Sequence, residues 1–189
     1  MLRWIGNAED PMAILKIARL GHPVLRKPCR ELSPDEIRSD GMRRFVDDMH
    51  NTLVEYGGVG LAAPQVHEPI RLALIEFGAD SSRYPVADEQ PLLVVFNARV
   101  TVLDATPSGF WEGCLSVPGM RGYVERPSGI RVDFLDAAGE ARSLQAQGFL
   151  ATVLQHELDH LDGVLYVDKI ADPTRFAFDE EFTRYHIES

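Results

Sequence analysis

The first strong pattern along the chain is a series of apolar residues that recur every three or four positions. These residues are Ile37, Met42, Phe45, Val46, Met49 and Leu53. Such spacing places their side chains on one face of an amphipathic α-helix. Ser33, Pro34 and Glu36 form a capping box with proline in the first turn, and Gly57 is suited to end the helix. We therefore predict one helix over residues 34–56.

The middle of the chain alternates between short apolar runs and turn-forming residues, which indicates β-strands. The predicted strands cover residues 70–76, 92–96, 99–104, 122–126, 129–135 and 141–147, with Asn97-Ala98 as a break after the second. Asp136-Ala137-Ala138-Gly139 is a hairpin turn signal. A second helix is predicted from Phe149 to about Leu161, ended by Gly163. Because short turns favour antiparallel pairing, we expect an α+β fold with antiparallel sheets packed around this C-terminal helix.

The remaining segments complete the expected organisation. Residues 1–12 are predicted to be an N-terminal extension and residues 13–189 a single domain. Within that domain, residues 13–31 form an extended arm because their prolines interrupt any helix. Residues 77–91 are polar and are predicted to be an irregular insertion, and residues 175–186 a last, helical segment.

Composition and charge exclude several classes of protein. The chain has 189 residues, of which 45% are hydrophobic and 25% charged, as in folded globular domains. A formal net charge of −10 argues against unassisted binding to nucleic acid or to an anionic membrane. No apolar run approaches the ~20 residues of a membrane helix. The two cysteines, Cys29 and Cys114, are too few for a disulfide framework and favour a reducing, cytoplasmic setting.

Candidate chemistry is concentrated in His156-Glu157-Leu158-Asp159-His160, an H-E-x-x-H motif inside the second predicted helix. Residues four apart lie on one helix face, one turn apart, so both imidazoles can converge on one divalent ion. Glu157 is suited to take a proton from a water molecule and return it. A chance pair of histidines is the alternative, but burying these polar groups without a ligand would be costly. The motif therefore makes residues 13–189 a candidate catalytic metalloenzyme domain.

A catalytic site of this kind needs a third protein ligand, and the chain offers three candidates. Tyr166 stands where a metzincin motif has its third histidine, and a phenol is not the expected ligand. Glu180 lies at the distance that gluzincins use, although Pro173 interrupts the helical path. Cys114 follows Gly113, which allows close backbone approach, and a thiolate beside two imidazoles suits Fe(II), zinc or Co(II).

Three motifs together resemble those of the peptide deformylases, in the order found in that family. They are Gly58-x-Gly60-Leu61-Ala62-Ala63-x-Gln65, Glu112-Gly113-Cys114-Leu115-Ser116 and His156-Glu157-x-x-His160. The similarity extends over roughly residues 14–170 and leaves out the N-terminal extension, the 77–91 insertion and the tail after Ala171. The resemblance implies an α+β metalloenzyme that removes the formyl group from the N-terminal formyl-methionine of newly synthesised polypeptides and releases formate.

The resemblance also implies a role for each motif residue. The metal ligands would be Cys114, His156 and His160. Fe(II) is the ion favoured in the cell, and zinc, nickel or cobalt are expected in preparations. Water activated by the metal would attack the formyl carbon, with Glu157 as general base and then general acid. The Gln65 side chain and the Leu115 backbone N–H would stabilise the oxyanion.

Four further residues are expected to bind substrate. Val59, Gly60 and Val117 are small or apolar and flank the motifs, which suits a methionine side chain, and the Gly60 backbone is free to pair with an extended peptide. Arg121 matches a family position that faces the peptide, with a plain surface arginine as an equal alternative. The expected partners are N-formyl-methionyl nascent peptides, with the ribosome as a candidate and with no nucleic acid or membrane.

Two other functions remain open on the residues alone. An H-E-x-x-H metalloprotease would use Glu180 as third ligand, and a structural metal site would need a fourth ligand such as Cys29. Otherwise we expect Cys29 to be a structural thiol, and Asp159 and Asp162 either to orient the ligand histidines or to face solvent. The histidines without a partner at motif spacing are expected at the surface: His22, His50, His67 and His186.

Overall fold

The computed structural model describes residues 13–78 and 89–187, so the predicted extension 1–12 and most of the predicted insertion lie outside the described residues. The α-helices are α1 (Pro34–Arg38), α2 (Asp40–Glu55), α3 (Gly148–Leu161) and α4 (Asp179–Tyr185). The strands are β1 (Gly60–Ala62), β2 (Leu72–Phe77), β3 (Gln90–Cys114), β4 (Val117–Leu135), β5 (Ala141–Gln147) and β6 (Phe176–Phe178). The 3-10 helices are η1 (Pro23–Arg26), η2 (Ala63–Val66), η3 (Tyr166–Lys169) and η4 (Pro173–Arg175). Within this part of the chain, no helix is long and apolar enough to span a membrane.

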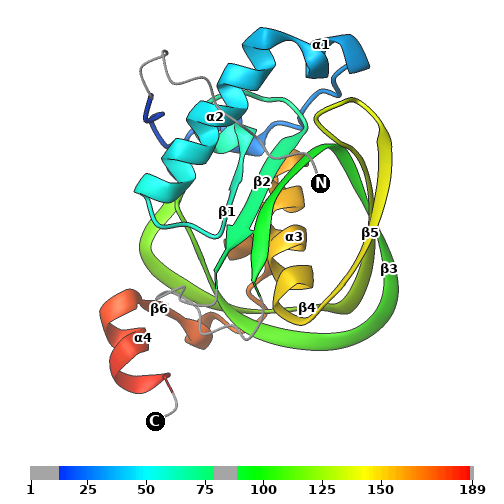
Figure 1. Ribbon diagram of the computed structural model, residues 1–189. Coiled ribbons are helices and arrows are strands. Elements are labelled where there is room, and N and C mark those ends of the chain that lie inside the picture. The colour runs from blue at the N-terminus through cyan, green and yellow to red at the C-terminus, as the bar shows by residue number, and fades with distance from the viewer. Residues whose placement is uncertain (1–12, 79–88, 188–189) are drawn as a thin grey trace.

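The strands form one antiparallel sheet in the order β1-β2-β3-β4-β5, and β6 pairs with β4 beside this path. Figure 1 shows the long strands β3, β4 and β5 curving around α3, while α2 lies outside, next to β1 and β2. This arrangement confirms the expected α+β fold with antiparallel strands around the helix that carries the H-E-x-x-H motif.

Strand β2 separates two parts of the core. Ala73, Ile75 and Phe77 belong to the apolar cluster that includes residues of α3. Leu72 and Leu74 alternate with them and belong to the cluster that includes residues of α2. Because successive side chains of a strand point to opposite faces, this continuous apolar run is buried on both sides. Helix α3 is consequently held in the interior, which is where its polar motif residues lie.

The prediction of one helix over residues 34–56 is wrong, because the chain leaves the helical conformation at Ser39. The φ and ψ angles of Ser39 are −64° and 147°, and its Oγ accepts the Met42 N–H at 3.2 Å as the N-cap of α2. Serine bonds readily to nearby backbone groups, which favours a cap over a helix interior. The predicted capping box between Ser33 and Glu36 is confirmed at the start of α1.

The predicted strand breaks near Asn97 and between residues 126 and 129 are also wrong. Asn97 adopts a φ of 51° at a register shift inside β3, and its side chain exchanges hydrogen bonds of 2.9 and 2.7 Å with the backbone of Leu32. It is therefore a bulge that anchors the N-terminal arm. Strand β4 continues through Pro127, where neither β5 nor β6 pairs with it, and proline is tolerated on such an edge.

Helix α3 confirms the second predicted helix and ends where its sequence indicates. Gly163 has a φ of +74°, its N–H donates to the His160 carbonyl at 3.2 Å, and the Val164 N–H donates to the Asp159 carbonyl at 3.0 Å. This glycine-based cap ends the helix directly after the motif. The predicted helical segment 175–186 is helical only within α4, because residues 176–178 pair with β4 as β6.

Candidate active site

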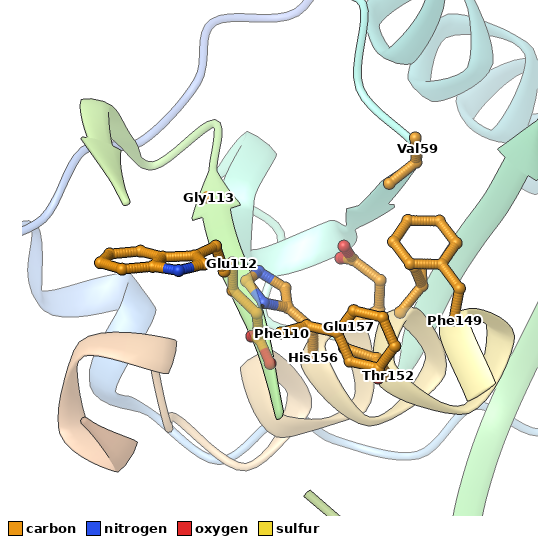
Figure 2. A pocket seen from close by; sticks show the side chains of 10 residues that line it. Val59, Phe110, Glu112, Gly113, Phe149, Thr152, His156 and Glu157 are labelled. Atoms are coloured by element: carbon orange, nitrogen blue, oxygen red, sulfur yellow. Dashed lines mark hydrogen bonds and ion pairs between the residues drawn. The ribbon is translucent and has the colours of Figure 1, made fainter. Parts of the chain in front are cut away.

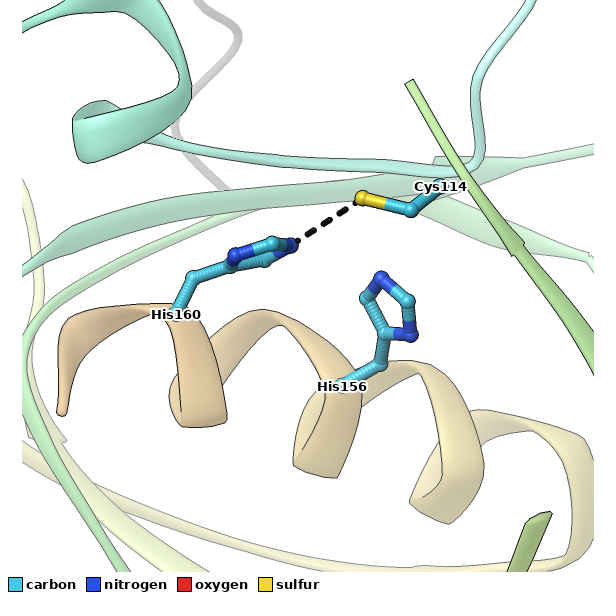
Figure 3. Close-up of side chains that lie close together, drawn as sticks. All are labelled: Cys114, His156 and His160. Atoms are coloured by element: carbon cyan, nitrogen blue, oxygen red, sulfur yellow. Dashed lines mark hydrogen bonds between the residues drawn. The ribbon is translucent and has the colours of Figure 1, made fainter. Parts of the chain in front are cut away.

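Three side chains that are far apart in sequence meet beside α3 (Figure 3). His156 and His160 project from successive turns of α3, and Cys114 is the last residue of β3. Their candidate ligand atoms lie within 4.8 Å of one another, and Cys114 Sγ is 3.3 Å from His160 Nε2. Both histidines are buried. The fold thus brings together the cysteine and the two histidines of the motifs.

This group of side chains fits a divalent transition-metal ion. A thiolate and two imidazoles are donors that iron, zinc and cobalt accept, and three protein ligands leave one coordination position open for chemistry. Among the residues that the structure describes, the cluster contains neither Glu180 nor Cys29. Cys29 instead packs in the apolar core, where burial raises the pKa of its thiol to about 11.

The side chain that orients His156 is Glu112, which the motif analysis did not assign a role. Glu112 Oε2 lies 2.7 Å from His156 Nδ1, and Arg126 bonds to both carboxylate oxygens of Glu112 at 2.5 and 2.9 Å. Burial by itself would raise the pKa of Glu112, but the bonds from Arg126 and His156 lower it on balance. A carboxylate at Nδ1 leaves Nε2 free as a ligand atom. The signal in the sequence is the place of Glu112 in the same motif as Cys114, two residues before it.

The two aspartates considered as orienting groups bond to cations instead. Asp159 Oδ2 accepts from Arg126 Nη1 at 2.7 Å, and Asp162 Oδ1 accepts from Arg71 Nη1 at 2.5 Å. Neither hydrogen bond involves His156 or His160, so these two bonds do not orient either histidine directly.

The four histidines outside the H-E-x-x-H motif make contacts with other side chains. His50 is half-buried, and its Nε2 lies 2.6 Å from Glu76 Oε2. His22 and His67 contact each other edge to face with ring centroids 4.7 Å apart, and the His186 ring lies 4.8 Å from that of Trp111. None of these four residues belongs to the metal-ligand cluster of the described chain.

Glu157 is buried beside the ligand cluster. Its Oε2 has no hydrogen-bond partner among the described residues, and burial raises the pKa of its carboxyl to about 7. A methyl group added at Gly60 would lie 2.6 Å from Glu157 Cγ, so the absence of a side chain at this glycine makes the room for the carboxylate. The group is thus free to exchange a proton with a molecule that enters from the side of β1.

The Gln65 side chain places an amide N–H₂ donor next to Cys114. Its Oε1 accepts the Ala62 N–H at 2.7 Å, which fixes the amide so that Nε2 faces Cys114 Sγ at 3.4 Å and Ser116 Oγ at 3.3 Å. Leu115 follows Cys114 and lines the same small cavity. A fixed amide N–H₂ is the kind of donor that can stabilise an oxyanion. The roles of Gln65 and of the Leu115 N–H as oxyanion donors stay predictions.

Two adjoining pockets open onto these groups. The reaction pocket is lined by Gly58, Val59, Gly60, Gln65, Gly113, Cys114, Leu115, His156 and Glu157. The apolar pocket is lined by Val59, Phe110, Trp111, Glu112, Gly113, Phe149, Thr152, Val153, His156 and Glu157. Figure 2 shows the Phe149 and Val59 side chains facing each other across this pocket. Val59 and Gly60 were expected near the site from their sequence positions, whereas the aromatic wall combines segments that are distant in sequence and that no local motif marks.

Val117 and Arg121 line neither of these two pockets. Val117 is buried in a small cluster with Val124 and Tyr166, against which Cys114 packs. Arg121 Nε donates to Asp179 Oδ1 of α4 at 3.0 Å, and its guanidinium lies 5.0 Å from the centre of the Phe182 ring. The roles of both residues in substrate binding stay predictions.

Two histidines of an interior helix and a cysteine of a neighbouring strand could hold a metal ion, and they lie beside a glutamate whose Oε2 has no hydrogen-bond partner in the described part of the chain. This combination is typical of a metal-dependent hydrolase, here on an α+β fold. Residues 14–176 match the sequence model of the family described as Polypeptide deformylase. The chain belongs to the peptide deformylase family. It is therefore an enzyme, a metal-dependent hydrolase that removes formyl groups.

Individual relatives agree with this assignment. The peptide deformylase of Leptospira biflexa is 42% identical over 170 residues, which cover 90% of this chain and 95% of that protein. The class I type b peptide deformylase of Acinetobacter baumannii, in a structure with Met-Ala-Ser bound, matches with a TM-score of 0.81 and 36% identity, covering 85% of this chain and 100% of that one. The Thermotoga maritima peptide deformylase matches with a TM-score of 0.75 and 31% identity, covering 84% and 99%.

Replacing Gly60 by alanine is expected to lower kcat/KM while the protein stays folded. The added methyl group collides with the Glu157 side chain, which must leave its position beside the ligands. Steady-state kinetics on a formylated peptide measure the effect. Gly41→Ala is the matched control, because an added methyl group there meets nothing within 4 Å. Equal kinetics of Gly60→Ala and Gly41→Ala would contradict the placement of Glu157.

Proposed function

We propose that this chain deformylates the N-terminal formyl-methionine of newly synthesised polypeptides and releases formate. The observation that carries this proposal is the meeting of Cys114, His156 and His160 with the unpaired carboxylate of Glu157 at one pocket. The peptide bound to the similar Acinetobacter enzyme, Met-Ala-Ser, begins with a methionine, as the product of such a reaction does.

The substrate is proposed to bind as an extra strand. Strand β1 is the first of the sheet order, so its outer edge has no partner among the described strands. An extended peptide can add to such an edge through main-chain hydrogen bonds, and Gly60 leaves that edge open next to Glu157. The methionine side chain then enters the apolar pocket between Val59, Phe110 and Phe149.

Cys114, His156 and His160 are proposed to hold one divalent ion. When bound, the ion acts as a Lewis acid and makes a nucleophilic water available at neutral pH. We propose Fe(II) as the ion in the cell, whereas zinc, nickel and cobalt suit the same donors in preparations. The thiolate ligand makes the iron form sensitive to oxidation.

The protein side chains account for the movement of protons and charge. Glu157 takes the proton of the attacking water and delivers it to the methionine nitrogen as the C–N bond breaks. Its pKa of about 7, raised by burial, suits a group that must both accept and donate. Gln65 Nε2 and the Leu115 N–H donate to the formyl oxygen while its negative charge grows.

The proposal also includes the setting of the reaction. Residues 13–189 act as one catalytic domain, with residues 1–12 as an extension. The enzyme works in the cytoplasm, on nascent peptides as they emerge from the ribosome.

Formate release from a formyl-Met tripeptide tests the function. Protein purified without oxygen and loaded with Fe(II) or Ni(II) is expected to release formate at about 1–10³ s⁻¹. The acetyl-Met tripeptide is the matched control, because it differs by one methyl group at the reacting carbon. A folded, metal-loaded sample that releases no formate would contradict the proposal. Comparing the rates of formate release by the Fe(II)-loaded and zinc-loaded proteins then tests the choice of ion.

A further inference from the structure

One buried arginine connects the strand and the helix that supply the ligands. Arg126 lies on β4 and is only 3% exposed. Its Nε and Nη2 donate to both oxygens of Glu112 on β3, at 2.5 and 2.9 Å. Its Nη1 donates to Asp159 Oδ2 on α3 at 2.7 Å. A single planar guanidinium is therefore bonded to two other elements at once.

The residues that Arg126 holds are neighbours of the ligands. Glu112 lies two residues before Cys114 on β3, and it also accepts from His156 Nδ1 at 2.7 Å. Asp159 directly precedes His160 on α3. The position of the guanidinium consequently affects the separation of the strand-borne cysteine from the helix-borne histidines.

The two bonded groups differ in how much they depend on Arg126. Asp159 has a second cation, since Lys169 Nζ lies 3.4 Å from the same carboxylate oxygen. Glu112 is 4% exposed, and Arg126 is its one cation partner among the ion pairs of the described residues, so without Arg126 its charge would be buried beside His156 alone. The Arg126–Glu112 pair is therefore the more important of the two links.

We propose that Arg126 is a positioning residue for the metal ligands, which acts through Glu112 on His156 and, to a lesser degree, through Asp159 on α3. The inference rests on the proposed function, because it assigns Arg126 to the same metal centre. It predicts that Arg126 controls how firmly the ion is held, although its hydrogen bonds in the described part of the chain go to Glu112 and Asp159 and not to a ligand side chain.

The test compares Arg126→Lys with Arg131→Met. Lysine keeps the charge but cannot bond to both Glu112 oxygens, while Arg131 lies on the same strand in an exposed ion pair with Asp133. Transfer of Co(II) from each loaded protein to a chelator gives the rate of metal release, and kinetics on formyl-Met peptides give kcat and KM. We expect Arg126→Lys to release metal about 10–100-fold faster and to lower kcat with KM little changed. Arg131→Met should match the unaltered protein.

A second pair of variants separates positioning from folding. Arg126→Met leaves Glu112 buried without its cation and is expected to weaken folding, whereas the double variant Arg126→Met with Glu112→Gln removes both charges. The double variant should fold better than Arg126→Met but still release metal faster than the unaltered protein. Asp159→Asn should have a smaller effect than Arg126→Lys, because it leaves the Glu112 pair intact.

Unchanged Co(II) release in both Arg126→Lys and the folded double variant would overturn the proposal, and so would an effect of Asp159→Asn that exceeds that of Arg126→Lys. The metal-release measurement needs no substrate, so it is independent of the activity assay. A protein that fails to release formate but shows the expected Co(II) release would contradict the proposed function and still support the role of Arg126.

Discussion

Cys114→Ala is expected to lose the metal and, with it, formate release down to background. The candidate ligand atoms of three side chains lie within 4.8 Å of one another, and removing the thiolate leaves two imidazoles on one helix. Two such ligands hold a divalent ion far more weakly than three, and the cysteine is the one anionic donor. Metal content after desalting, measured by elemental analysis, gives the first readout, and formate release gives the second.

The matched control for this prediction is Glu180→Ala. Glu180 was the alternative third ligand, and it lies on α4 outside the described ligand cluster. The control should keep its metal and its activity. If Glu180→Ala lost the metal while Cys114→Ala kept it, the centre would be that of a metalloprotease with a carboxylate ligand.

Glu157→Gln is expected to keep the metal and to lower kcat by about 10²–10⁴-fold, the usual contribution of a general acid–base. Glutamine has almost the volume of the buried glutamate, so packing against Gly60 is retained while the proton acceptor is lost. Metal content and circular dichroism should match the unaltered protein. Formate release under substrate saturation measures the loss.

Asp162→Asn is the matched control for that change. It also converts a carboxylate to an amide near α3, but Asp162 is exposed and pairs with Arg71. Its kcat should stay close to the unaltered value. An equal loss of kcat in both variants would show that the effect of Glu157→Gln is a general electrostatic one, and would contradict its role in proton transfer.

The two predictions together distinguish the parts of the site. Cys114 acts by holding the ion, so Cys114→Ala should lower the metal content. Glu157 acts only in proton transfer, so Glu157→Gln should lower turnover and leave the metal content unchanged. Arg126 lies between these cases, because it is expected to change metal release and kcat by positioning Glu112 and His156.

Local rules explain which elements the sequence could predict. Helix α3 was found with its cap because period, motif and Gly163 all act within a few residues. The prediction of a single helix over residues 34–56 is wrong at Ser39, because the apolar period continues through this position although the serine caps a new helix. The predicted strand break at Asn97 is wrong because hydrogen bonds with the backbone of Leu32, which is distant in sequence, stabilise the positive φ of Asn97 inside the strand.

The fold class, the H-E-x-x-H helix, the motif that contains Cys114 and the resemblance to a family can all be inferred from local sequence patterns. The partners of these residues are visible only in the folded chain: Glu112 and Arg126 next to His156, Phe110 and Phe149 in the pocket wall, and the room that Gly60 leaves for Glu157. The spacing of two ligands on a helix is predictable because it follows from the 3.6-residue period. Charge compensation and pocket walls depend instead on contacts between strands and helices that no local pattern specifies.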